Sequence, residues 1–116
     1  MSEISYEMIN EWIVDNFPEE TILLVSGMEN AFIGIAYQCN TAIAVYDRYK
    51  SIHSLKKSGM SQDEAEEYFS FNTQGSYMGA HTPAFLEKFK KPKNNLNKNK
   101  ITSEQFTFNF NEISNI

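Results

Sequence analysis

The stretch AFIGIAYQCNTAIAVYD, from Ala31 to Asp47, decides the fold. Its apolar, β-branched and aromatic residues fall into two runs, Ala31–Tyr37 and Thr41–Tyr46, which meet near Gln38-Cys39-Asn40. Such runs are typical of strands, so the stretch predicts two consecutive strands, although the first run also fits a helix. Gly34 lies inside the first run and indicates a bulge or a close backbone approach.

A further strand and a helix are expected before this stretch. Thr21–Val25 (TILLV) is β-branched and apolar throughout, which predicts a strand buried on both faces. Three strands in succession favour a meander. Upstream, Ser5 is a plausible N-cap and Pro18 ends a helical pattern. The apolar stripe of this first helix comprises Met8, Ile9, Trp12 and Ile13.

Two more helices are predicted after the stretch. Asp47 stands at an N-cap position, and the apolar side of the helix that follows comprises Tyr49, Ile52, His53 and Leu55. Ser61 and Glu64 match the S-x-x-E capping box at the start of a third helix, expected from Gln62 to about Asn72. This helix is expected to bury Ala65, Tyr68 and Phe69. Ala84–Phe89 is expected to form a short strand or a turn of helix.

Together these segments predict an α+β fold: a small, mainly antiparallel sheet of three to four strands, covered by three helices. The compact domain is expected over residues 1–89, followed by a Lys/Asn-rich linker over 90–100 and a C-terminal tail over 101–116. In this tail Phe106, Phe108 and Phe110 alternate with polar residues, which predicts a strand over 105–110 that adds to its own sheet or to that of a partner.

Composition narrows the class of protein. The chain has 116 residues, room for one domain, and its single cysteine, Cys39, excludes an internal disulfide. Neither a signal peptide nor a membrane span is evident, so we expect a soluble protein that is not exported. Residues 1–87 carry a net charge of −9, whereas residues 88–116 carry +4. The acidic body repels nucleic acid, and only the Lys-rich tail is expected to contact phosphate directly.

Four ordered blocks of sequence carry a resemblance. They are SGMENAFIGIA (Ser26–Ala36), AVYDRYK (Ala44–Lys50), GMSQDEAEEYFSFN (Gly59–Asn72) and GSYMGAHTPAF (Gly75–Phe85). The set resembles a widespread family of short uncharacterised proteins found mostly in bacteriophage genomes, with a pattern YD…MSxEEAxEYFxxN…GxYxGxxTP. The chain departs from it at Ser26 and Asn30, where Asp is more usual. The resemblance implies a phage origin and no particular activity.

The predicted binding surface is the loop from Asn72 to Pro83 together with the tail strand. Irregular backbone at paired glycines can present side chains to a partner, although a purely structural turn is the simpler interpretation. The residues proposed to bind are Asn72, Gly75, Tyr77, Gly79, His81, Phe106, Phe108 and Phe110.

Four acids form a second candidate set. Glu29, Asp47, Glu66 and Glu67 are expected on an acidic surface. As ligands for a hard cation or as an acid–base pair they are less plausible than as helix caps and solvated residues. His53 is expected to be partly buried by packing, and His81 to lie in a loop. Neither histidine has a second His or a Cys at ligand spacing, so no metal, cofactor or catalytic residue is predicted.

The functional hypothesis is a phage accessory protein that binds a host or phage protein in the host cytoplasm. Modulation of a host defence or nucleic-acid enzyme is one form of it, because an acidic surface can compete for a DNA-binding groove. Two alternatives remain: a virion-associated structural protein anchored by its tail, and a small metal- or ligand-dependent enzyme that uses Glu29, Asp47 and His81. The oligomeric state is open.

Overall fold

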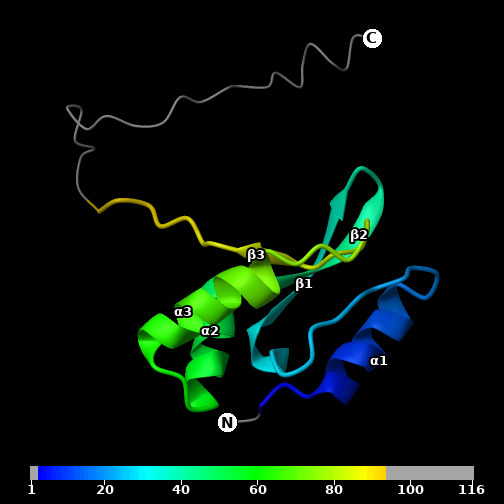
Figure 1. Ribbon diagram of the computed structural model, residues 1–116. Coiled ribbons are helices and arrows are strands. Elements are labelled where there is room, and N and C mark those ends of the chain that lie inside the picture. Colours follow the sequence, from blue (N-terminus) through cyan, green and yellow to red (C-terminus); the bar gives the residue numbers. More distant parts are fainter. Residues whose placement is uncertain (1–2, 94–116) are drawn as a thin grey trace.

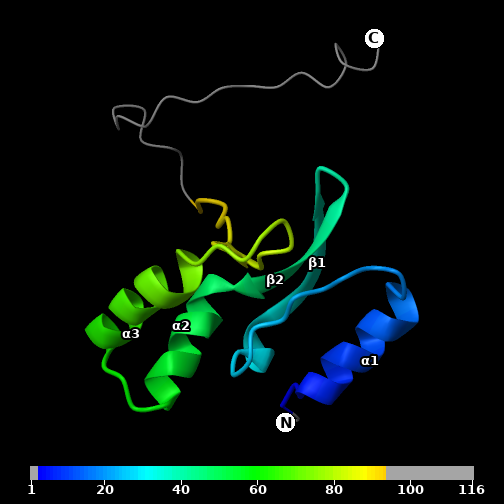
Figure 2. The same ribbon diagram turned by 45° about the vertical axis from the view of Figure 1, so that its right-hand side comes forward.

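A computed structural model describes residues 3–93 and has the α+β fold predicted from the sequence. Its sheet has three strands in the order β1-β2-β3. In both views the helix α1 lies apart from the pair α2 and α3, with β1 and the segment leading into it between them (Figures 1 and 2). The elements are α1 (Tyr6–Asn16), β1 (Phe32–Gln38), β2 (Thr41–Asp47), α2 (Arg48–Lys57), α3 (Gln62–Phe69) and β3 (Ala84–Leu86).

The strands β1 and β2 form an antiparallel hairpin, as their sequence predicts. Its two turn residues, Cys39 and Asn40, have φ values of 53° and 64°. Positive φ at both central positions suits the right-handed twist of the flanking strands. The register shifts between Phe32 and Gly34, so the bulge expected at Gly34 is present. The helical alternative for the first run is thereby excluded.

The prediction of a meander was wrong. Thr21–Val25 forms no strand, and the third strand is β3, which runs parallel to β2 along Val45–Asp47. The segment is only partly buried between Ile22 and Val25, and the Val25 amide donates its hydrogen bond to a side chain. A β-branched, apolar run indicates a half-buried surface, and it does not by itself require a partner strand.

The predicted helix starts are confirmed by their caps. Ser5 Oγ accepts from the Met8 amide, and Asp47 Oδ1 accepts from the Lys50 amide. At α3 both hydrogen bonds of the capping box between Ser61 and Glu64 are present. The helix α3 does not continue as an α-helix to Asn72, because a π-helical turn, Ser70–Gln74, follows it directly.

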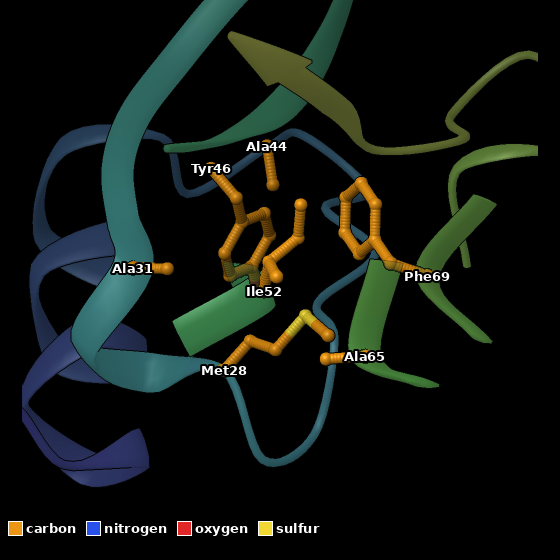
Figure 3. Close-up of a cluster of buried hydrophobic side chains, with 7 residues drawn as sticks. All are labelled: Met28, Ala31, Ala44, Tyr46, Ile52, Ala65 and Phe69. Carbon is orange, nitrogen blue, oxygen red and sulfur yellow. The ribbon is translucent and has the colours of Figure 1, made fainter. Parts of the chain in front are cut away.

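A row of aromatic rings crosses the core and joins the helices to the sheet. Neighbouring ring centroids lie 4.8–6.2 Å apart along the series Trp12, Phe32, Tyr46, Phe85, Phe69. Figure 3 shows Tyr46 and Phe69 with Ile52 among the buried side chains. The prediction of burial was wrong for Tyr68 and His53, which are exposed because they lie on helix faces turned away from this core. Tyr49, predicted on the apolar side of α2, is 78% exposed as well.

Tyr46 fixes the segment that leads into β1. Its side chain is 1% exposed, and its hydroxyl accepts a 2.8 Å hydrogen bond from the Val25 amide. The pKa of Tyr46 is raised, mainly because the side chain is buried. The hydrogen bond from Val25 lowers this pKa, and the Glu29 carboxylate raises it. The hydroxyl therefore stays protonated at neutral pH and connects β2 to a segment 21 residues earlier in the chain.

We expect the substitution Tyr46→Phe to lower the free energy of unfolding by about 1–2 kcal/mol, because the partly buried Val25 amide loses its acceptor. Urea denaturation measures the change. Tyr37→Phe is the matched control, since Tyr37 is 60% exposed and its substitution should change stability little. Equal stability of the Tyr46→Phe variant and the wild type would contradict the role given to this hydroxyl.

Candidate functional site

A surface depression lies beside α3 and contains one end of the predicted binding loop. This α3 hollow has a volume of about 650 Å³. Two exposed aromatic side chains, Tyr68 and Phe71, line it, at 44% and 76% exposure. Asn72, predicted as a binding residue, and Glu67, predicted as part of an acidic surface, line it as well. The full lining is Ser58, Gly59, Met60, Glu64, Glu67, Tyr68, Phe71 and Asn72.

The π-helical turn shapes the C-terminal end of this hollow. The Gly75 amide donates to the Ser70 carbonyl at 3.1 Å, and the Ser76 hydroxyl donates to the Asn72 carbonyl at 2.9 Å. A Cβ at Gly75 would lie 2.9 Å from the Ser70 carbonyl oxygen. Gly75 has φ −84°, so the turn does not use a positive φ at this position. A glycine is needed at this position because the Ser70 carbonyl lies so close to its backbone. This close approach allows the π-helical turn next to Phe71 and Asn72 to form.

Two other predicted loop residues, Tyr77 and Gly79, line a different depression, next to the β1–β2 turn. This hairpin hollow, of about 330 Å³, is lined by Gln38, Cys39, Thr41, Ile43, Tyr77, Gly79, Ala80 and Thr82. Gly79 has a positive φ, 90°, and Tyr77 is 82% exposed. His81 is partly buried, and its Nδ1 lies 3.2 Å from the Ala42 carbonyl oxygen. Of the predicted binding residues, Asn72 therefore lines the α3 hollow and Tyr77 and Gly79 line the hairpin hollow, whereas Gly75 and His81 line neither. Phe106, Phe108 and Phe110 lie outside the described residues.

The four candidate acids do not converge. Glu29 accepts from the Gly27 amide, Asp47 caps α2, and Glu67 lines the α3 hollow. Glu66, although next to Glu67, lines a small cleft between α2 and α3 instead. Within residues 3–93 no group of three or more His, Cys, Asp or Glu side chains is placed to hold a metal ion. The three residues of the enzyme alternative, Glu29, Asp47 and His81, each bind a different backbone group.

Asp47 is a buried carboxylate with a structural role. Its side chain accepts from the Lys50 amide at 2.9 Å, and Lys88 Nζ lies 3.4 Å from Oδ2. Burial alone raises the pKa of Asp47, but the hydrogen bond from the Lys50 amide and the charges of Lys88 and Lys50 outweigh it and hold the pKa below its usual value. The ionised form is therefore favoured in the folded state.

The lowered pKa of Asp47 predicts a pH dependence of stability. Its contribution is fully present above the unfolded pKa of about 3.9 and is lost as the pH falls through the lower folded pKa. Asp47→Asn keeps a capping side chain without the charge, so the loss of unfolding free energy on acidification should become shallower. Urea denaturation across the acidic range tests this, with the exposed Asp15→Asn as control. An unchanged pH profile for Asp47→Asn would contradict the assignment.

Substitution by Asn should change the free energy of unfolding by different amounts at Gly75 and Gly79. Gly75→Asn should lower the free energy of unfolding by about 1–3 kcal/mol, because its Cβ meets the Ser70 carbonyl. Gly79→Asn should cost less, since no atom lies within 4 Å of a Cβ there and Asn tolerates positive φ better than most residues. Thermal unfolding ranks the two variants, and the opposite order would refute the explanation of the π-helical turn.

Another depression contains residues that, apart from Asp47, the prediction did not include. This basic hollow, of about 450 Å³, is lined by Asp47, Tyr49, Lys50, Leu86, Glu87, Lys88 and Lys90. The sequence does contain a signal for it: residues 1–47 and 58–87 have no Lys or Arg, so every basic side chain lies in two short segments. The comparison of net charge between residues 1–87 and 88–116 does not reveal this pattern.

Comparison with known proteins gives no further identification: no protein-family model, curated protein or solved structure matches the chain. Among the helices of residues 3–93, none has the length and apolar character required to cross a membrane.

Proposed function

We propose that the protein acts by binding another protein and that the α3 hollow is a docking surface. The observation that carries this proposal is the exposure of Tyr68 and Phe71 at a depression of about 650 Å³. A small domain gains stability by burying such rings, and exposed aromatic side chains are enriched where partners bind. Side chains that enter such a depression commonly supply much of the binding energy of an interface.

The charge of the surface indicates the chemistry of the partner. Glu64 and Glu67 line the α3 hollow, and no Lys or Arg among residues 3–93 lines it. The acids on and around α1 are also exposed, and no Lys or Arg occurs in residues 1–47. These acids are Glu3, Glu7, Glu11, Asp15, Glu19 and Glu20. A partner segment with apolar side chains flanked by Lys or Arg would complement the hollow.

A partner with a basic surface is consistent with the sequence hypothesis. Host defence and nucleic-acid enzymes carry such surfaces where they contact phosphate. The resemblance to short phage proteins supports a role as a phage accessory protein in the cytoplasm of an infected cell. We therefore propose that binding modulates an enzyme of this kind.

Affinity capture of the tagged full-length chain from infected-cell lysate tests the proposal. A stoichiometric partner held by the wild type should be lost with Phe71→Ser, whose side chain is 76% exposed and contributes little to the core. With the captured partner purified, the variant should bind at least about tenfold more weakly. Tyr49→Ser is the matched control, because Tyr49 is 78% exposed and does not line the α3 hollow.

Two adjacent acids give a second, electrostatic control. Glu67→Lys should weaken the partner's association, most strongly at low ionic strength. Glu66→Lys makes the same change of charge one residue away, but Glu66 lines the cleft between α2 and α3, so binding should persist. Absence of any partner, or a partner retained equally by all four variants, would refute the docking role of the α3 hollow.

A further inference from the structure

The basic residues of this acidic chain are confined to two segments. All ten Lys and Arg residues lie within residues 48–57 and 88–100. The first segment is the helix α2, and the second begins two residues after β3. Segregation on this scale gives one part of the surface a positive potential despite the formal net charge of −5.

The fold brings these two segments together at the N-terminal end of α2. Leu86, the last residue of β3, is in register with Asp47, the N-cap of α2. Lys88 Nζ lies 3.4 Å from Asp47 Oδ2, and Arg48 Nη1 lies 3.7 Å from Glu87 Oε1. Lys50 of the first segment and Lys88 and Lys90 of the second line the basic hollow, together with the paired acids Asp47 and Glu87.

Two aromatic side chains accompany these lysines. Tyr49 is 78% exposed and lines the basic hollow, and Phe89 is 85% exposed and stands between Lys88 and Lys90 in the sequence. The Tyr49 ring is nearly parallel to that of His53, at an interplanar angle of 9° and a centroid distance of 6.4 Å. We call the basic hollow with Phe89 the basic aromatic face.

We propose that the basic aromatic face binds single-stranded nucleic acid, independently of the α3 hollow. Lysine side chains neutralise phosphates, and exposed rings stack on bases whatever their identity. A duplex suits the face less well, because its bases are already stacked on each other. An acidic peptide would use the lysines but would leave Tyr49 and Phe89 without a planar partner. The acids of α1 lie apart from α2 (Figure 1) and would orient the chain with this face toward the strand.

Fluorescence anisotropy of a labelled oligothymidylate with the full-length chain tests the proposal. Binding at low salt should weaken as salt rises, and Phe89→Ala should raise the Kd roughly five- to 150-fold, the range for loss of one stacked base. The double variant Lys50→Gln/Lys90→Gln should reduce the slope of log K against log salt by about 1.4, near 0.7 per lost phosphate contact.

Matched variants locate the effect. Lys56→Gln/Lys57→Gln removes the same charge from the other end of α2 and should leave the salt dependence of binding almost unchanged. Phe71→Ser removes a comparably exposed ring from the α3 hollow and should leave the Kd unchanged. Lack of salt-dependent binding, or equal losses from the two lysine pairs, would overturn the proposal. Tighter binding to polyglutamate than to oligothymidylate would also overturn it, in favour of an acidic protein partner.

Discussion

The hydroxyl of Tyr46 is the point at which the separate parts of this small fold are joined. The side chain comes from β2, contacts the rings of Phe32 and Phe85, and accepts from the Val25 amide. The apolar segment before β1 forms no strand, and it is held by this bond and by the packing of Ile22, Leu24 and Val25 against the core. A buried polar group thus helps to place a segment that regular secondary structure does not hold.

This framework has consequences for the surface. Because β3 pairs with the end of β2, the chain leaves the sheet beside the N-cap of α2, where Lys88 reaches Asp47. After α3, the π-helical turn closed by Gly75 leaves Phe71 at the α3 hollow. The core therefore positions an acidic aromatic depression and a basic aromatic face as separate surfaces of one domain, and each suits a partner of opposite charge.

Local signals predicted the elements that depend on local physics. The caps at Ser5, Asp47 and Ser61 follow from side-chain oxygens next to helical patterns, and the bulge at Gly34 follows from a glycine within a strand. The elements that depend on distant contacts were missed. Thr21–Val25 has the composition of a strand, but its Val25 amide bonds to the Tyr46 hydroxyl and not to a neighbouring strand. This contact joins residues that are distant in the sequence, so no local sequence pattern predicts it. The predicted site residues do not form one site for the same reason: residues that are neighbours in sequence, such as Glu66 and Glu67, line different depressions.

The central claim is that one domain carries two independent surfaces of opposite character. Amide chemical-shift mapping by NMR tests it most directly, with the isotope-labelled full-length chain titrated first with oligothymidylate and then with a peptide whose leucines are flanked by lysines. The account predicts two separate sets of shifted amides: one around Tyr49, Lys50 and Lys88–Lys90, and one around Gly59, Glu67 and Phe71. A single shared set for both ligands, or shifts from neither, would contradict it.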